Sequence, residues 1–220
     1  MTFAYSPIYP IFDNVQWFER LLPVIARSRE THRMTDRPMW IQLRQKTGSE
    51  AELRHAIRHA DQLCRAHDCQ LIVNDYWQWA IDEGCSFVHL GQEDLDEADL
   101  STIRAAGIAL GVSTHSHEEL RRAQALQPEY IALGPIYPTT LKSMSWQPQG
   151  LTRITEWQSL IGDTPLVAIG GMNLERAASA WSAGADSVAM VTDVLLHPQP
   201  ELRMAQWFEQ YDQHRARHAK

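Results

Sequence analysis

The stretch "LIVNDYWQWAIDEGCSFVHLGQED" at residues 71–94 decides the fold. It holds two apolar runs separated by a short helical pattern, and acidic and amide residues follow each run. Short apolar runs that alternate with helices are typical of parallel strands in repeated βα units. The polar residues therefore fall where two neighbouring parallel strands end.

Eight apolar runs of this kind occur along the chain. Their spacing of about 25 residues favours a single (β/α)8 barrel, an α/β TIM barrel, over a doubly wound sheet. Helical patterns lie between them, for example "EELRRAQAL" at 118–126 and "LERAASAWSAG" at 174–184. The predicted strands are 8–12, 39–44, 70–74, 86–90, 108–112, 130–134, 166–170 and 187–191.

The composition predicts one domain that spans residues 1–220. A chain of 220 residues with 44% hydrophobic residues is long enough for one sizeable core. Its formal charge of −7, from 20 basic and 27 acidic residues, offers no broad basic surface for nucleic acid. The chain contains no apolar run of about 18 residues, and its first residues lack the pattern of a signal peptide. We therefore expect a cytoplasmic protein without a membrane partner.

One segment resists the barrel pattern. Residues 26–38, "ARSRETHRMTDRP", are polar, lack an apolar period and end in proline. Such a composition is typical of a long exposed connection. We expect this segment to be an insertion outside the packed body.

Several histidines and cysteines receive an ordinary structural interpretation. His115 and His117 stand two residues apart at the expected start of a helix, so we expect both on the surface. His89 lies inside an apolar run and is expected to be a hydrogen-bonded core residue. The cysteines form no CxxC pair and are expected to be buried thiols in a reducing compartment: Cys64, Cys69 and Cys85.

The second predicted strand carries cations at its end. Because side chains alternate along a strand, Gln42, Arg44 and Lys46 share one face. If Ile41 and Leu43 pack on the helices, these three side chains point into the barrel mouth. Two cations there would suit an anion with several oxygens. The alternative is that Arg44 and Lys46 lie beyond the strand and meet solvent.

The carboxylates of the opening stretch lie one strand apart at the same mouth. Asp75 and Asp94 would supply the hard oxygens that Mg²⁺ prefers when it also binds a phosphate. The alternative interpretation is that each caps the helix that follows it, a common position for aspartate.

Two later segments complete the expected mouth. Gly170 and Gly171 end the seventh predicted strand, where barrels often bind a phosphate between strands seven and eight. The loop 134–151 is long and carries Lys142, so it could close over the site as a lid or remain a plain connection.

Taken together, the motifs resemble the thiamine-phosphate synthase family. They are "QLRQK", "VNDYW", "VHLGQEDL", "LGVSTH", "ALGPIYPTTLK" and "VAIGGMN", in this order between about residues 8 and 195. The resemblance implies a (β/α)8 barrel transferase that uses Mg²⁺ as cofactor. It would condense an aminopyrimidine diphosphate with a thiazole phosphate to give thiamine phosphate and pyrophosphate. Its partners would be these small molecules, and a homo-oligomer is left open.

The resemblance also implies roles for individual residues. Those expected to act in catalysis are Lys142, Arg44, Lys46 and Ser113. The other implied roles are contact with the pyrimidine for Gln42, with the diphosphate for Arg44, Lys46, Asn74 and Lys142, with Mg²⁺ for Asp75 and Asp94, with both substrates for Ser113 and Thr139, and with the thiazole phosphate for Gly171, Val191 and Thr192.

Three positions depart from the family pattern: Leu141, Thr192 and Asp193. Together with the polar segment 26–38, they keep in view a non-catalytic protein that binds thiazole phosphate or thiamine phosphate. A thiazole tautomerase on the same scaffold is the other alternative, and the retained residues assigned to the diphosphate and Mg²⁺ argue against it. Asp193 would repel a phosphate beside it, so we expect its side chain to turn away and cap the helix that follows.

Overall fold

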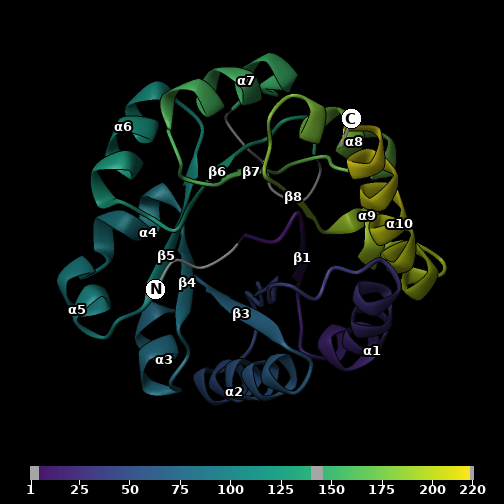
Figure 1. The fold of residues 1–220 in the computed structure, drawn as a ribbon. Helices are drawn as coiled ribbons and strands as arrows, with labels where there is room; N and C mark the ends of the chain where they lie inside the picture. The colour runs from purple at the N-terminus through teal and green to yellow at the C-terminus, as the bar shows by residue number, and fades with distance from the viewer. Residues whose placement is uncertain (1–4, 140–145, 219–220) are drawn as a thin grey trace.

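The computed structural model describes residues 5–139 and 146–218 and contains a closed barrel of parallel strands. Each strand pairs with its neighbours in chain order, and β1 also pairs with β8 (Figure 1). The predicted (β/α)8 barrel is therefore confirmed. The strands are β1 (Ile8–Phe12), β2 (Met39–Leu43), β3 (Cys69–Asn74), β4 (Phe87–Leu90), β5 (Ala109–Thr114), β6 (Tyr130–Leu133), β7 (Leu166–Ala168) and β8 (Ser187–Met190).

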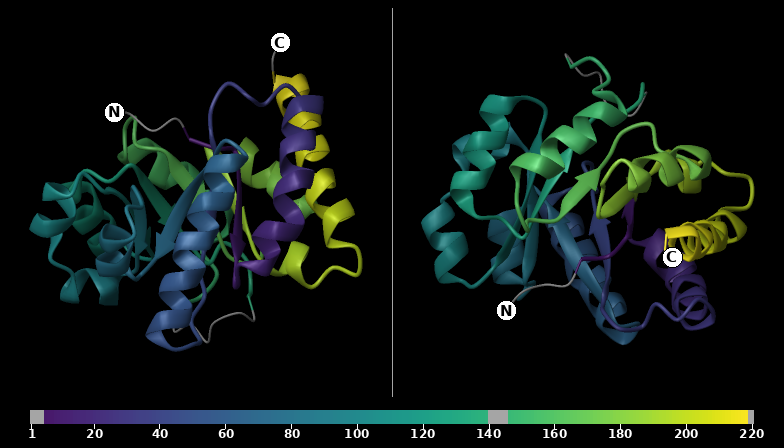
Figure 2. Two further views of the ribbon diagram at one scale, coloured as in Figure 1. Left: turned by 90° about the horizontal axis from the view of Figure 1, so that it is seen from below. Right: turned by 45° about the horizontal axis from the view of Figure 1, so that its top comes forward.

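Helices surround the barrel, and the first and last long helices lie side by side (Figures 1 and 2). No helix in residues 5–139 or 146–218 combines the length and the apolar character needed to cross a bilayer. The helices are α1 (Gln16–Thr31), α2 (Glu50–Ala66), α3 (Trp77–Asp82), α4 (Gln92–Glu97), α5 (Leu100–Ala105), α6 (His117–Leu126), α7 (Gly150–Leu160), α8 (Leu174–Ser182), α9 (Thr192–Leu195) and α10 (Pro200–His218).

Side-chain alternation divides the core into two clusters. The larger one lies between strands and helices and includes Ile41, Leu43 and the buried cysteine Cys64. Burial raises the pKa of the Cys69 and Cys85 thiols to about 12, which agrees with the prediction of buried thiols. The smaller cluster fills the barrel itself and consists of Tyr9, Ile11, Trp40, Ile72, Phe87, Ala109, Tyr130, Ala132, Val167 and Ala189.

The seventh strand ends earlier than the sequence predicts because its two glycines leave strand geometry. Gly170 and Gly171 have φ values of 96° and 65°, which favour glycine. A Cβ atom at Gly170 would lie 2.6 Å from Cα of Pro135, and one at Gly171 would lie 2.5 Å from the carbonyl oxygen of Pro138. The pair therefore allows the loops after β6 and β7 to pack together.

The prediction that residues 26–38 form an exposed insertion is wrong for its first half. Residues 26–31 continue α1, and the side chain of Arg29 is buried. Its guanidinium donates to the carbonyl oxygens of Met34, Arg37, His67 and Asp68 over 2.6–3.3 Å. The polar segment is thus held to the start of β3 by one cation, at the N-terminal end of the barrel.

We predict that Arg29→Ala lowers the free energy of unfolding by about 3 kcal/mol, because several carbonyl groups lose a charged donor. Urea denaturation measures the change. Arg27→Ala, two positions earlier on the exposed side of α1, is the matched control and should stay within about 0.5 kcal/mol of the parent. An equal loss in both variants would contradict the anchoring role of Arg29.

Candidate active site

A cavity of about 540 Å³ opens at the C-terminal ends of the strands. It collects side chains from most of the barrel, as expected for a site on this fold. Lys142 and Leu141 lie outside the described residues. The sequence-predicted residues that line this cavity are Gln42, Arg44, Lys46, Asn74, Asp75, Asp94, Ser113, Thr139, Gly171, Val191 and Thr192.

The end of β2 has the predicted alternation. Ile41 and Leu43 pack in the outer cluster, whereas Gln42 points inward and donates from Nε2 to Tyr9 Oη at 2.8 Å. The backbone N–H of Arg44 donates to Phe12 at the end of β1 over 2.7 Å. Gln42 and Arg44 both line the cavity. This agrees with the interpretation that these side chains point into the barrel mouth.

Lys46 forms an ion pair with Asp75 across the end of β3. Asp75 has a φ of 64°, and its backbone N–H donates to the carbonyl oxygen of His89 at 3.0 Å. This left-handed backbone turns Asp75 toward the cavity, and its side chain is 13% exposed. Asp75 therefore does not cap α3. Tyr76 occupies the position before that helix, and its side chain makes no capping hydrogen bond.

Asp94 lies inside α4 rather than before a helix, so it does not cap a helix that follows it. Its Oδ2 accepts a hydrogen bond from the backbone N–H of Gly91 at 3.0 Å, at the start of α4. It also lines the cavity. A carboxylate has more lone pairs than this one bond uses, so Asp94 keeps acceptor capacity toward the cavity.

The described lining residues carry more negative than positive charge. Arg44 and Lys46 are their only lysine and arginine side chains, against four carboxylates. A multiply charged anion would therefore enter more readily with a divalent cation than without one. The four carboxylates belong to Asp75, Glu93, Asp94 and Glu119.

The other side of the cavity is built from the ends of β7 and β8. Gly171 lines it, and its carbonyl oxygen accepts from Nη1 of Arg176 at 2.5 Å. Val191 precedes α9, whose first residue is Thr192. Backbone N–H groups at such a turn are suited to a phosphate.

Asp193 turns away from the cavity, as expected, but it does not cap a helix. Its carboxylate accepts from both Nε and Nη2 of Arg203, at 2.9 and 2.7 Å, and from Nε1 of Trp207 at 2.9 Å. The side chain is 10% exposed. The capping prediction is wrong because the partners of Asp193 lie on α10. A local sequence pattern does not indicate contacts with that helix.

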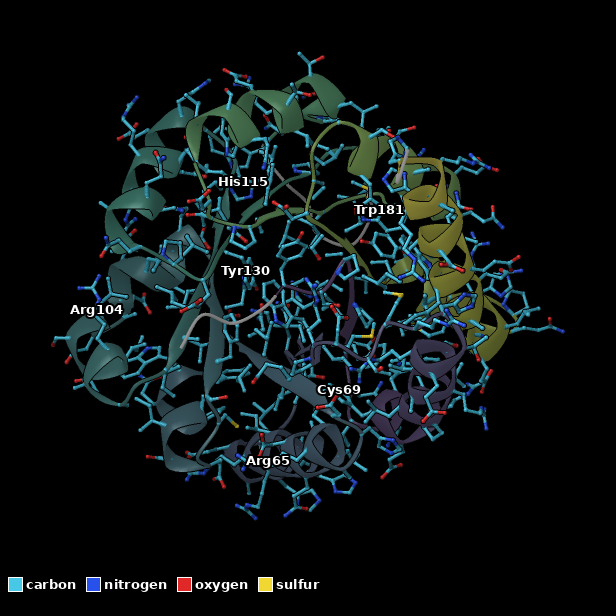
Figure 3. The ribbon with its side chains drawn as sticks, viewed as in Figure 1. Arg65, Cys69, Arg104, His115, Tyr130 and Trp181 are labelled. Atoms are coloured by element: carbon cyan, nitrogen blue, oxygen red, sulfur yellow. The ribbon has the colours of Figure 1, made fainter. Side chains whose placement is uncertain are left out.

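A chain of hydrogen bonds runs along the floor of the cavity. Tyr9 Oη and Tyr130 Oη are 2.8 Å apart, and Tyr130 Oη lies 2.7 Å from Nδ1 of His89. Nε2 of His89 lies 2.8 Å from Ser113 Oγ, and Gln42 ends the chain on the other side. Figure 3 shows Tyr130 inside the ring of strands. The prediction that His89 is a hydrogen-bonded core residue is confirmed, although it also lines the cavity.

Burial lowers the pKa of His89 to about 4, with Asp94 opposing this shift and Arg44 and Lys46 adding to it. Burial likewise raises the pKa of Tyr9 and Tyr130 above the ordinary tyrosine value. All three side chains are therefore neutral at pH 7, so the chain of hydrogen bonds holds no net charge.

The surface prediction for His115 is wrong, whereas that for His117 is confirmed. His115 lines the cavity, and its Nδ1 lies 2.9 Å from Glu119 Oε2 (labelled in Figure 3). The ring of Trp146 stacks on it at 5.5 Å between centroids and 5° between planes. Their sequence spacing gave no sign of this cluster, because β5 runs two residues further than predicted.

These features define a (β/α)8-barrel enzyme whose polar groups gather at the C-terminal mouth. Residues 19–194 match the family model described as thiamine monophosphate synthase. The thiamine-phosphate synthase of Rhizobium etli is 50% identical over 92% of this chain and 93% of its own length. That of Salmonella schwarzengrund is 44% identical over 85% and 83%. The chain belongs to the thiamine-phosphate synthase family, whose members are transferases.

A solved structure supports the fold. Thiamine phosphate pyrophosphorylase from Pyrococcus furiosus superposes with a TM-score of 0.72. The match covers 94% of this chain and 96% of that chain, at 23% identity.

We predict that Asp193→Ala lowers the free energy of unfolding by about 2 kcal/mol, because Arg203 and Trp207 lose a shared acceptor. Urea denaturation measures this loss, and steady-state kinetics at low and high salt should give unchanged Michaelis constants. A tenfold lower Michaelis constant for a phosphate substrate would instead mean that Asp193 faces the cavity.

We further predict that the free energy of unfolding falls as the pH drops from about 6.5 to about 4, because of the low pKa of His89. In this window the unfolded histidine binds a proton that the folded one excludes. The loss approaches about 3 kcal/mol at pH 4. His89→Gln should flatten this part of the pH profile of unfolding, whereas the exposed His117→Gln should not. Parallel profiles for all three proteins would contradict the low pKa.

Proposed function

We propose that the cavity joins an aminopyrimidine diphosphate to a thiazole phosphate and releases thiamine phosphate and pyrophosphate. The observation that carries the proposal is the meeting of Arg44, Lys46 and Asn74 with Asp75 and Asp94 around one cavity. Cations, an amide and two carboxylates together suit a diphosphate with its metal ion.

In this proposal Arg44, Lys46 and Asn74 bind the diphosphate. Lys142 is assigned to the same group by the family motif. Lys46 reaches the diphosphate by exchanging its ion pair with Asp75 for a phosphate oxygen. Gln42 and Ser113 hold the pyrimidine ring at the cavity floor.

The donor set fits Mg²⁺ held jointly by protein and substrate. In the described residues no cluster of three or more acidic, histidine or cysteine side chains suits a metal. Mg²⁺ commonly binds one or two carboxylates, with water and substrate phosphates completing its shell. Asp75 and Asp94 would hold it, and when bound it would neutralise diphosphate oxygens.

The thiazole phosphate is assigned to the opposite side, near Gly171, Val191 and Thr192, with Thr139 beside it. Asp193 does not oppose this assignment because its charge is paired with Arg203. Thr192 supplies a hydroxyl at the position where the family commonly has another small hydroxyl residue.

The proposed reaction needs neither a protein nucleophile nor a strong base. The carbon–oxygen bond to the diphosphate breaks, and pyrophosphate leaves with the electron pair. The remaining pyrimidine-methyl cation is stabilised by its own ring amine, and the thiazole nitrogen then bonds to that carbon. Arg44 and Lys46 neutralise the charge that grows on pyrophosphate, and the cavity keeps the two substrates aligned.

We also propose that the enzyme works in the cytoplasm, and the buried free thiols of Cys64, Cys69 and Cys85 support this.

The direct test mixes the purified protein with both substrates and Mg²⁺ and measures thiamine phosphate and pyrophosphate. Equal amounts of the two products are expected. Binding of thiazole phosphate without any product would favour the non-catalytic alternative. Isomerisation of a thiazole without use of the diphosphate would favour the tautomerase.

We predict that Asp94→Asn lowers kcat/KM by about a hundredfold or more and raises the Mg²⁺ concentration needed for half-maximal rate. The amide keeps the side-chain volume but removes the charge. Glu97→Gln, an exposed position at the other end of α4, is the matched control and should leave both quantities unchanged. A wild-type rate for Asp94→Asn at low Mg²⁺ would refute the metal assignment.

A further inference from the structure

The hydrogen bonds along the cavity floor join Gln42 to Ser113 through Tyr9, Tyr130 and His89. We call this chain the relay. Every adjacent pair in it is separated by 2.7–2.8 Å. The relay consists, in order, of Gln42, Tyr9, Tyr130, His89 and Ser113.

The Gln42 amide faces Tyr9 with its donor end, and this orientation is compatible with one direction for all bonds in the relay. Its Nε2 donates to Tyr9 Oη. Either oxygen of the Tyr9–Tyr130 pair could donate, and the relay assigns the Tyr9 hydrogen to Tyr130. Tyr130 then donates to Nδ1 of His89. A neutral imidazole that accepts at Nδ1 carries its proton on Nε2, which donates to Ser113 Oγ.

This direction leaves opposite groups at the two ends. The Gln42 amide also forms a side-chain hydrogen bond to Tyr130, so its two Nε2 hydrogens are directed to the two tyrosines. Gln42 keeps its Oε1 as an acceptor, and Ser113 keeps its hydroxyl hydrogen as a donor. Both residues line the cavity. The floor is therefore complementary to a ring that donates at one position and accepts at another.

We propose that the relay is a polarity lock, which makes the floor accept a ring bearing an amino group and reject the same ring bearing an oxo group. The inference rests on the proposed function, because it concerns how the pyrimidine is recognised. Tyr9, Tyr130 and His89 are positioning residues in this view, since they act through Gln42 and Ser113.

The lock is cooperative because the residues between the ends are buried. Turning the Gln42 amide over to suit an oxo group would present Oε1 to Tyr9, and Tyr9 would have to donate to it. Tyr130 would then donate to Tyr9, and the proton of His89 would move to Nδ1. A reversal at one end thus requires reversal of every bond, because a partly reversed chain leaves a buried polar group unpaired.

The backbone makes room for the relay at Gly111. A Cβ atom there would lie 2.2 Å from the Cζ atom of Tyr130 and 2.6 Å from its Oη. The ring of Tyr130 also lies parallel to that of His89, 5.6 Å away at 11°. The tyrosine hydroxyl is therefore held between its two partners by packing as well as by hydrogen bonds.

The test compares the binding of two unreactive probes. They are the 4-amino and 4-oxo forms of the 2-methylpyrimidine diphosphate, with a CH2 group in place of the ester oxygen. Calorimetry with Mg²⁺ gives both Kd values. We expect the wild-type protein to bind the amino probe more tightly. Tyr130→Phe should reduce the ratio of the Kd for the oxo probe to the Kd for the amino probe by about tenfold or more. The variant breaks the relay and leaves Gln42 with Tyr9 alone.

Trp40→Phe is the matched control, because Trp40 packs against both tyrosines in the same interior cluster. It should change both Kd values by the same factor and leave their ratio within about twofold of the wild type. An unchanged ratio in Tyr130→Phe would overturn the proposal, as would an equal fall of the ratio in both variants.

A second measurement needs neither substrate nor a variant of Tyr130. Nitrogen-15 NMR of histidine-labelled protein, with His89 assigned from His89→Gln, reports which ring nitrogen carries the proton. The relay requires the proton on Nε2, and a proton on Nδ1 would overturn it. If the wild-type protein binds neither probe, the proposed function fails while the NMR result still decides the relay.

Discussion

The alternation of side chains along parallel strands is the constraint on which the site depends. Closure of the barrel sends every second side chain of each strand inward, so a residue's place in the strand decides its role. Ile41 and Leu43 face the helices, and Gln42 between them faces the cavity. A shift of β2 by one residue would exchange these roles and remove the amide from the floor.

The electrostatics of the cavity follow from where the strands end. Arg44 and Lys46 come just after β2, and Asp75 and Asp94 follow β3 and β4. The Lys46–Asp75 ion pair satisfies both charges before a ligand arrives. In the proposed function a diphosphate with its metal ion would offer each member a new partner of opposite charge, so the exchange would leave neither charge unpaired.

The predictable part of the molecule is the part controlled by short-range patterns. All eight strands could be found because each is a short apolar run. Arg44, Asp75 and Asp94 share one cavity because polar groups at the ends of parallel strands meet at one mouth. The contacts that could not be predicted join distant segments. Arg29 binds carbonyl oxygens near residue 68, and Asp193 pairs with Arg203 on α10. His115 was misplaced because the extent of β5 depends on its pairing with β6.

Burying the polar side chains of the relay costs free energy in a barrel interior that is otherwise apolar. A set of well-packed hydrophobic side chains would fill the same space without any requirement for exact partners. The relay avoids the cost of unpaired polar groups because each member has a neighbour within 2.8 Å. Packing alone would leave the amide of Gln42 free to turn over, since its oxygen and nitrogen ends have nearly the same shape. Only directional bonds distinguish those ends, so a site that reads an amino group needs polar residues beneath it.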